Sequence, residues 1–359
     1  MRVIFFPIIF WLRKSTKIKD FQNRKPRPKI KINTLLVLII TSISSLAYSK
    51  EYTEILIDSK TGNILHQYNA LAFNYPASLT KLMTLYLTFE SLNNGKLSLD
   101  QELTISRRAA KQPRSNIRLK ENETITVRQA ILAVIIKSAN DAAVVLSEAN
   151  SESEWFFTDL MNRKAKSIGM YDTHFRNASG LHHDDQFSTA KDMAILAFHI
   201  KAEFPEYFDL FSKTAFRYQK RLYTTHNHLL VKYKTVNGIK TGYTRKSGFN
   251  LISSAIYKEN EIIGVIMGAK SSQIRDRNMM RLLKRKLYSM HSFVSNTSSE
   301  NSIKAKRITK ASIGTFFPYP EPQKKPQKND FELQILDTKK NLFYIKGDIV
   351  IPTPSQKPI

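Results

Sequence analysis

The sequence predicts a mixed fold of the α/β (α+β) class, in which β-hairpins and buried helices share one large domain. Alternating hydrophobic segments lie near both ends of residues 50–290, and short polar turns join them in pairs, as in β-hairpins. Between these pairs lie apolar segments with the length and spacing of buried helices. The 359 residues are 42% hydrophobic, which is enough for a large core.

The chain divides into three regions by composition. Residues 1–49 are basic and contain an apolar core at 35–40 followed by small residues, the pattern of a secretory signal. That core is shorter than the roughly 20 residues of a membrane helix, although an uncleaved anchor is left open. Residues 50–290 form the predicted main domain. Residues 291–359 are a basic linker and a short, partial β-rich tail, with strand material at 331–351.

The net charge is +26, with a pI near 10.0. Such a charge suits nucleic acid, an anionic membrane surface or an anionic polymer such as a cell wall. Because no zinc-finger, RRM-like or basic-region pattern is present, no nucleic-acid partner is expected. The chain has no cysteine, which excludes disulfides, thiolate metal sites and cysteine nucleophiles.

The individual elements follow from local patterns in the first half of the domain. A hairpin is predicted at 53–68 around the turn 59–62, and a helix then starts near Ser78 and ends at Asn93-Asn94-Gly95. Residues 96–127 are polar and irregular, with three apolar anchors. Helices follow at 127–136, 141–149 and 154–166. The anchors are Ile117, Leu119 and Ile125, and the aromatic residues of the last helix, Trp155 and Phe156, are expected in the core.

The second half is expected to supply most of the sheet. Thr189 is predicted to cap the helix 193–202, with Asp192 as its acidic partner in a capping-box-like arrangement. Strands are predicted at 213–223, 236–241, 248–257 and 261–269, and a basic helix at 275–289.

Pro76-Ala77-Ser78-Leu79-Thr80-Lys81 opens the first long helix. Ser78 and Lys81 are spaced i, i+3, so they share one helix face and lie in its first turn. A hydroxyl there has an amine within hydrogen-bond reach, which a serine nucleophile needs when no histidine is used. A second S-x-x-K, Ser188 to Lys191, is better interpreted as a helix start.

Three short signatures occur in chain order. A second K-T-G, Lys60 to Gly62, lies in a hairpin turn ahead of the serine and is therefore set aside. A closely similar ordered set is typical of acyl-transfer enzymes that use a serine nucleophile with a lysine. The signatures are Ser78-x-x-Lys81, Ser138-x-Asn140 and Lys240-Thr241-Gly242.

The surrounding residues match more closely than the triplets require. Four stretches, Pro76-Ala-Ser-Leu-Thr-Lys, Ser138-Ala-Asn-Asp, Thr173-x-Phe-x-Asn-x-x-Gly-Leu and Gly238-Ile-Lys-Thr-Gly-Tyr-Thr, resemble the low-molecular-mass penicillin-binding proteins. More narrowly, the chain is similar to a serine D-alanyl-D-alanine carboxypeptidase over about residues 50–290. The resemblance implies the DD-peptidase/β-lactamase-like fold, an antiparallel sheet covered by helices plus a mostly helical subdomain.

The resemblance also implies the reaction and its partners. Ser78 would attack the carbonyl between two D-alanines of a peptidoglycan stem peptide and form an acyl-enzyme. Lys81 is the expected proton acceptor, with the identity of the base left open, and Ser138 would relay a proton to the leaving amine. β-Lactam antibiotics would bind covalently, and no cofactor or metal is expected. The expected location is the periplasm or cell envelope, with association with the inner membrane surface left open.

The remaining site residues would bind substrate. Asn140 would hold Lys81 and the substrate amide, while Lys240 and Thr241 would supply charge and a hydroxyl to the terminal carboxylate. Gly242 would allow backbone to approach the strand closely. The N–H groups of Ser78 and Tyr243 would form the oxyanion hole. Arg275, placed by its spacing after Gly268, would lie near the substrate carboxylate.

Three alternatives are weighed against this interpretation. A β-lactamase of class A uses a glutamate with an asparagine a few residues on, and the candidates Glu203 and Glu206 lack that asparagine. A DD-endopeptidase that cuts peptidoglycan cross-links differs only in its leaving group. A non-catalytic wall-binding protein would not need the intact serine and lysines. The run His182-His183-Asp184-Asp185 is interpreted as a solvated loop, and His226 and His228 as packing or cleft-lining residues.

Overall fold

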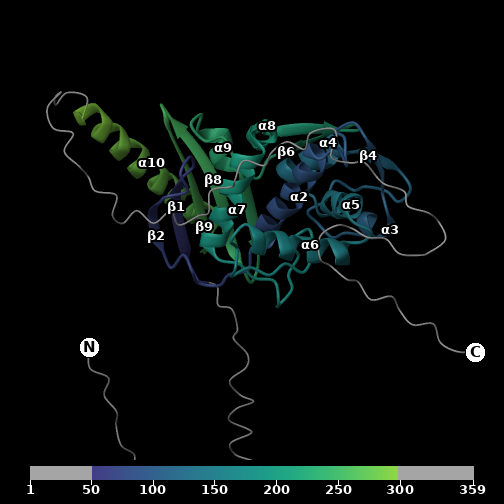
Figure 1. The fold of residues 1–359 in the computed structure, drawn as a ribbon. Helices are drawn as coiled ribbons and strands as arrows, with labels where there is room; N and C mark the ends of the chain where they lie inside the picture. Colours follow the sequence, from purple (N-terminus) through teal and green to yellow (C-terminus); the bar gives the residue numbers. More distant parts are fainter. Residues whose placement is uncertain (1–50, 298–359) are drawn as a thin grey trace, which may run out of the picture. The chain divides into compact units, whose positions relative to one another are not determined.

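The computed structural model describes residues 51–297 (Figure 1). The predicted signal segment and the strand material of the tail lie outside the described residues. The last helix, α10 (Ser272–Thr297), continues past the boundary predicted near residue 290. Within residues 51–297, no helix combines the length and apolar character needed to cross a bilayer.

A five-stranded antiparallel sheet with the order β2-β1-β9-β8-β7 forms the centre of the fold. The predicted hairpins are confirmed, since β1 pairs with β2 and β8 with β9. The two hairpins join through β1 and β9, where Ile55 lies opposite Val265. Strand β7 pairs only with β8 and is therefore an edge of the sheet. The strands are β1 (Thr53–Asp58), β2 (Ile64–Tyr68), β7 (Lys240–Thr244), β8 (Gly248–Tyr257) and β9 (Asn260–Ala269).

Helices cover both faces of this sheet. Along β1, Ile55 and Ile57 belong to the larger apolar cluster, whereas Leu56 packs in a second cluster with residues of α10. This alternation follows from the two-residue repeat of a strand. Helix α7 (Ala190–Glu203) packs on the first face and α10 on the other (Figure 1). Gly264 allows the second contact, because a Cβ there would lie 2.8 Å from the sulfur of Met279.

The helical part is built around α2, whose apolar residues are buried almost all round. Residues 96–127 contain more regular structure than predicted, namely a pair of short strands and one short helix. The three anchors predicted there, Ile117, Leu119 and Ile125, are buried as expected. The elements are α2 (Lys81–Asn93), β3 (Glu102–Thr104), α3 (Arg107–Ala110), β4 (Thr124–Thr126), α4 (Val127–Leu132), η2 (Ala133–Lys137), α5 (Asn140–Asn150) and α6 (Glu154–Ser167).

The prediction that the aromatic residues of α6 lie in the core is wrong for two of them. Trp155 is 71% exposed and Phe156 48% exposed, whereas Phe157 and Met161 are fully buried. The buried residues recur every four positions, so Phe157 defines the inward face and its two aromatic neighbours point outward.

Two strand predictions in the second half also need correction. The segment 213–223 is a hairpin of two short strands, β5 (Ala215–Tyr218) and β6 (Arg221–Thr224), because the chain turns at Gln219 with φ +50°. Strand β7 begins only at Lys240, and Val236 makes a single isolated bridge to Ala255. Three short helical segments complete the described chain: α8 (Pro205–Phe208), η3 (Asp209–Ser212) and α9 (His228–Lys232).

Candidate active site

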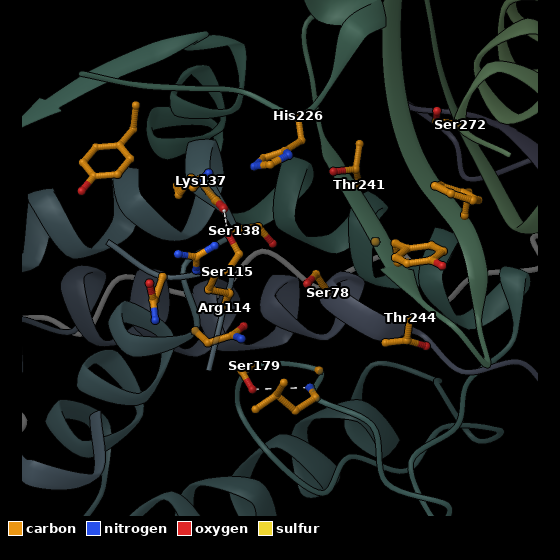
Figure 2. Close-up of a pocket in the computed structure, with 18 of the residues that line it drawn as sticks. Ser78, Arg114, Ser115, Lys137, Ser138, Ser179, His226, Thr241, Thr244 and Ser272 are labelled. Carbon is orange, nitrogen blue, oxygen red and sulfur yellow. Dashed lines mark hydrogen bonds between the residues drawn. The ribbon is translucent and has the colours of Figure 1, made fainter. Parts of the chain in front are cut away.

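A cleft of about 770 Å³ brings the predicted residues together (Figure 2). Ser78 lies in the middle, with Ser138 and Asn140 on one side and Thr241, Gly242 and Tyr243 of β7 on the other. Because β7 is the edge strand of the sheet, its free edge borders the cleft. The volume lies in the range of small-molecule and peptide sites.

Ser78 and Lys81 meet at the start of the long helix, but Ser78 lies in a 3₁₀ turn and not in the first turn of the α-helix as predicted. Ser78 lies in a 3₁₀ turn, η1 (Ala77–Thr80), which Pro76 opens, and Lys81 is the first residue of α2. Side chains three apart are eclipsed in a 3₁₀ turn. The Lys81 Nζ is therefore 3.2 Å from the Ser78 Oγ.

The Lys81 amine is completely buried and has two further acceptors. Its Nζ donates to the Oδ1 of Asn140 at 2.7 Å and to the backbone carbonyl of Ser179. Burial, and then the positive charge of Lys240, lower the pKa of Lys81 well below the ordinary lysine value. A neutral amine keeps two N–H groups for the two carbonyls and directs its lone pair at the Ser78 hydroxyl.

Ser138 and Lys240 form a second hydroxyl–amine pair across the cleft. The Lys240 Nζ donates to the Ser138 Oγ at 2.8 Å and to the carbonyl of Thr241 at 3.0 Å. Burial, and then the charge of Arg275, lower the pKa of Lys240 to about 7. Ser138 itself has a left-handed backbone with φ +59°, a conformation that non-glycine residues adopt mainly where the surrounding structure imposes it.

The β7 residues and Arg275 complete the wall opposite Ser138. Gly242 packs directly against the backbone of residues 76–78. A Cβ there would lie 3.1 Å from the Pro76 carbonyl oxygen and 3.2 Å from the Ser78 nitrogen. Thr241 and Tyr243 also line the cleft. Arg275 lies at the start of α10, buried, with its guanidinium paired to Asp276 at 2.7 Å. All nine residues predicted for the site thus lie in or directly against one cleft.

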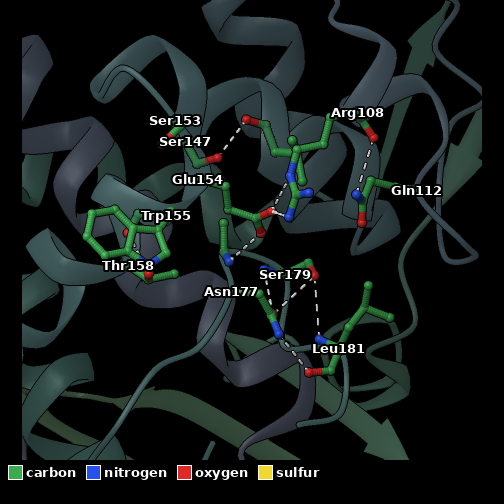
Figure 3. A network of polar contacts seen from close by, with 12 residues as sticks. Arg108, Gln112, Ser147, Ser153, Glu154, Trp155, Thr158, Asn177, Ser179 and Leu181 are labelled. Atoms are coloured by element: carbon green, nitrogen blue, oxygen red, sulfur yellow. Dashed lines mark hydrogen bonds and ion pairs between the residues drawn. The ribbon is translucent and has the colours of Figure 1, made fainter.

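The loop 177–181 supplies the partner of Lys81 that the sequence did not reveal, the Ser179 carbonyl. Asn177 organises this loop, since its Oδ1 accepts from the Gly180 nitrogen at 2.7 Å. Its Nδ2 also donates to the Leu181 carbonyl at 2.9 Å (Figure 3). Gly180 has φ +78°, and a Cβ there would lie 1.9 Å from the Ala77 carbonyl oxygen. The stretch from Thr173 to Leu181 is part of the resemblance. This motif indicates that the loop belongs to the site. It does not show which backbone carbonyl contacts Lys81, because every residue has one.

An ion pair between the exposed Arg108 and the buried Glu154 supports the same loop from behind. The Glu154 carboxylate binds Arg108 and also accepts from the Ala178 nitrogen at 2.9 Å (Figure 3). Glu154 is buried although it is the first residue of α6. Burying a charge costs stability unless the charge is paired, and these two partners compensate the carboxylate. This contact joins the helical part of the fold to the position of the Ser179 carbonyl.

Asp141, next to Asn140, holds the opposite wall. Its buried carboxylate accepts from the backbone nitrogens of Ile117 at 3.0 Å and Leu119 at 3.1 Å. The Asn140 nitrogen donates to the Ser115 carbonyl at 2.6 Å. Residues 113–119 are thereby fixed along the Ser138 side of the cleft, an arrangement that sequence reasoning did not anticipate.

The second S-x-x-K, Ser188 to Lys191, and the second K-T-G, Lys60 to Gly62, lie outside the site. Ser188 is buried beside Thr173, and Thr189 accepts from the Asp192 nitrogen as an N-cap, as predicted. The Asp192 carboxylate binds Thr173 instead of closing a capping box. Lys60 and Thr61 lie in the β1–β2 turn, where both backbone nitrogens donate to Asp58.

Other polar groups take structural or cleft-lining positions. Glu203 accepts from Tyr86 at 2.6 Å and pairs with His199, and neither it nor Glu206 lines the cleft. His226 and His228 do line it. In the loop 182–185, the His182 and Asp184 side chains contact each other at 3.1 Å. Among the described residues, no group of three or more His, Asp or Glu side chains could hold a metal ion.

Known proteins are similar to this chain over most of its described residues. The D-alanyl-D-alanine carboxypeptidase family model matches residues 44–271. D-alanyl-D-alanine carboxypeptidase DacF of Bacillus subtilis is 34% identical over 67% of this chain and 62% of its own length. The chain therefore spans about three-fifths of that curated relative.

Two solved structures show the same fold. Penicillin binding protein 5 of Haemophilus influenzae superimposes with a TM-score of 0.63 at 33% identity, over 66% of this chain and 70% of its own. Penicillin-Binding Protein D2 of Listeria monocytogenes, in its cefotaxime-bound form, has a TM-score of 0.60 at 30% identity, over 66% of this chain and 97% of its own. The family match, which covers more than half of the chain, and the ordered motifs around one cleft show that the chain belongs to the D-alanyl-D-alanine carboxypeptidase family.

Proposed function

We propose that the protein is a serine D-Ala-D-Ala carboxypeptidase that removes the terminal D-alanine from peptidoglycan pentapeptides. The observation that carries this proposal is the Lys81 amine, which is buried, 3.2 Å from the Ser78 hydroxyl, and bound to two carbonyl acceptors. In this setting a lysine with a lowered pKa is a base that faces a nucleophile.

The acylation step follows from these contacts. The Ser78 Oγ bonds to the carbonyl carbon of the penultimate D-alanine as its proton passes to Lys81. The C–N bond then breaks, and a proton reaches the leaving amine through Ser138, whose Oγ is bound to Lys240. Water next attacks the ester, releases the shortened peptide and restores the Ser78 hydroxyl. Both steps balance with water as the only co-reactant.

The remaining residues have roles in binding and charge stabilisation. The backbone N–H groups of Ser78 and Tyr243 would hold the oxyanion, supported by the close approach of Gly242 to Ser78. Lys240, Thr241 and Arg275 would bind the terminal carboxylate, since two cations and a hydroxyl converge at that end of the cleft. Asn140 would orient both Lys81 and the substrate amide.

The alternatives have less support. A class A β-lactamase needs a glutamate that activates water, and no acidic side chain of the described residues lines this cleft. A non-catalytic wall-binding protein would have no use for two buried lysines beside serine hydroxyls, since burying such cations costs stability. Cleavage of cross-links uses the same groups with a larger leaving group and is the alternative activity.

The proposed location is the cell envelope, to which the protein would be exported. The signal-like N-terminal segment and the wall substrate support this proposal. β-Lactam antibiotics are the proposed covalent inhibitors. The cefotaxime-bound relative supports this, because it shares the fold over the whole catalytic part. Association with the membrane surface is a further proposal that rests on the high net positive charge alone.

The test is D-alanine release from a pentapeptide ending in D-Ala-D-Ala. Purified protein is expected to release one D-alanine per peptide, and Ser78→Ala to release none. The matched control is Ser188→Ala, which alters the serine of the other S-x-x-K outside the cleft and should retain the activity. Protein that cleaves cross-linked dimers but releases no terminal D-alanine would replace this proposal with the endopeptidase function.

A further inference from the structure

A second pocket lies away from the serine cleft, between the segment that follows α9, the end of β8 and α10 (Figure 1). Its volume is about 290 Å³, and it shares no lining residue with the cleft. We call it the lysine pocket, after the three lysines that line it. Its floor consists of four buried apolar residues, Val236, Ala255, Met280 and Leu283.

The rim of the lysine pocket carries positive charge that no described residue balances. Lys232, Lys234 and Lys284 line it and are exposed, whereas no acidic side chain of residues 51–297 lines it. None of the three forms an ion pair within that part of the chain. The amines of Lys232 and Lys284 lie 5.6 and 5.5 Å from the centre of the same Tyr233 ring. A carboxylate placed there would attract both cations.

Backbone contacts fix the shape of the lysine pocket. Val236 pairs with Ala255 of β8, and the Ile256 nitrogen donates to the Thr235 carbonyl at 2.8 Å. The four floor residues belong to the apolar cluster that also contains Leu56 of β1. The pocket is therefore formed in advance, and a ligand would bind there without the cost of ordering its walls.

The size and chemistry of the lysine pocket suit a side chain of a polypeptide. Pockets that enclose a drug-sized molecule have volumes of about 300–1,000 Å³, and this one lies just below that range. Its buried floor favours an apolar side chain, and its rim favours carboxylates beside that side chain. The expected ligand is thus an acidic, partly apolar peptide segment.

The tail of the chain, residues 298–359, contains such a segment in its sequence and lies outside the described residues. The tail has six acidic residues, and three of them, Asp330, Glu332 and Asp337, lie in the eight residues 330–337, which contain no Lys or Arg. We call residues 330–337 the acidic segment. Its residues Phe331, Leu333 and Ile335 occur at every second position, the spacing that places side chains on one face of an extended chain.

The chain is long enough to bring the acidic segment to the lysine pocket. Lys284 lies 13 residues before Thr297, the end of α10, which corresponds to about 20 Å at 1.5 Å per helical residue. The acidic segment begins 33 residues after Thr297, and 33 residues can extend over about 100 Å. The tail can therefore turn back along α10 to the pocket.

We propose that the acidic segment docks in the lysine pocket of the same chain. An apolar side chain of the segment fills the floor, and the carboxylates of Asp330 and Glu332 pair with the lysines at the rim. The tail is thereby tied to the α9 and α10 side of the catalytic part. This inference goes beyond the proposed function and does not depend on it, because the pocket and the cleft share no lining residue.

Hydrogen exchange of the full chain tests the docking. In the wild type, amides of the acidic segment should exchange at least about tenfold more slowly than in Lys232→Glu, Lys284→Glu, where repulsion replaces attraction. Adding Asp330→Lys and Glu332→Lys to that variant reverses both partners and should restore protection to within about threefold. The control Lys166→Glu, Lys213→Glu makes the same change in net charge at exposed positions outside the pocket, and it should keep the wild-type protection. Unchanged exchange in β1 and β9 would show that each variant is folded.

Carbodiimide cross-linking of the wild type supplies a second measurement, which holds even if the reversed variants fail to fold. The reagent joins a carboxylate to an amine in direct contact, so it should link the acidic segment to Lys232, Lys234 or Lys284. A mixture of unlabelled and isotope-labelled protein separates links within one chain from links between copies. Four results would each overturn the inference: fast exchange of the acidic segment in the wild type, equal protection in Lys232→Glu, Lys284→Glu, no recovery in the combined variant, or links only between copies.

Discussion

Lys81 is fully buried, and two carbonyl oxygens and one hydroxyl surround its amine. A charged amine there loses its hydration, and the nearby Lys240 repels it. The same burial that makes the position costly for a cation suits the amine for the proposed role of base. The sequence predicted the pair Ser78–Lys81 and the Asn140 contact. It could not predict the Ser179 carbonyl, because any residue offers one and only the fold selects which carbonyl approaches.

The stability of the protein should depend on pH through Lys81. The unfolded chain holds this proton up to about pH 10.5, whereas the folded protein releases it at a lower pH. In that window the unfolded state binds more protons, so the free energy of unfolding rises with pH, by up to about 1.4 kcal/mol per unit. Urea unfolding at several pH values should show a steeper rise in wild type than in Lys81→Met. Parallel curves for the two proteins would contradict the lowered pKa of the buried Lys81 amine.

The rate of acylation should depend on pH through two lysines. Losing the proton from Lys81 creates the base, so kcat/KM should rise with pH on its acidic limb. Losing the proton from Lys240, whose pKa is lowered to about 7, removes a positive charge from the carboxylate site, so kcat/KM should fall above that pH. Lys240→Arg keeps the charge and should move the falling limb to higher pH. An unchanged limb in that variant would assign it to another group.

At the scale of elements, the site depends on how closely the loop 177–181 and the strand β7 approach η1. Both approaches occur at glycines, Gly180 and Gly242, where a Cβ would lie within about 3.2 Å of backbone atoms of residues 76–78. The position of the nucleophile is thus set by backbone packing from two sides. Such packing transmits small displacements directly to Ser78.

Gly180→Ala should therefore damage both stability and activity. Its Cβ would meet the Ala77 carbonyl oxygen at 1.9 Å, so η1 must shift, and we expect a loss of about 2–4 kcal/mol together with about 100-fold slower acylation. Gly95→Ala is the matched control, since Gly95 has a similar φ of +70° but open space around it. It should lose about 1 kcal/mol and keep its acylation rate. Equal effects of the two substitutions on stability and acylation rate would show that the cost comes from a side chain at positive φ and not from the contact with η1.

Most elements could be predicted from the sequence, and the differences have physical causes. Apolar periodicity identified α2, α6, β8 and β9, but on α6 it could not tell which of three adjacent aromatic residues, Trp155 to Phe157, faces inward. That choice depends on the neighbouring helices. The segment 213–223 has strand composition throughout, and only a left-handed turn at Gln219 divides it into a hairpin. The predicted site residues lie together because their motifs are short and local, while their roles stay predictions. The sequence did not reveal the supporting carboxylates of Asp141 and Glu154, because they contact residues far from them along the chain.

At the scale of the molecule, the described residues contain a five-stranded sheet with both faces covered, two two-stranded sheets, and a cleft in or directly against which every predicted site residue lies. The helix α10 passes the predicted boundary near residue 290. The division into a catalytic part and a tail stays a prediction, because the tail lies outside the described residues. The predicted site residues lie between Ser78 and Arg275, within the described part of the chain.

A shortened protein tests that division. Residues 50–297 contain all the elements of the described fold, so we expect this fragment to fold cooperatively and to release D-alanine at a rate within about twofold of the full chain. Limited proteolysis of the full chain should leave a fragment ending near residue 297. Protection of residues 330–351 is expected if the tail forms a β-rich unit, and rapid digestion there would reject the tail prediction. An inactive or unfolded fragment would show that the catalytic part needs the tail.

The proposed function requires that Ser78 forms an acyl-enzyme with Lys81 as its base. The most direct measurement is mass spectrometry of the protein after incubation with a penicillin, followed by digestion to locate the adduct. We predict one penicillin per chain, attached to the peptide that contains Ser78, no adduct in Ser78→Ala, and labelling slowed by at least about 10³-fold in Lys81→Met. An adduct on another residue, or Lys81→Met protein that labels at the wild-type rate, would contradict this mechanism.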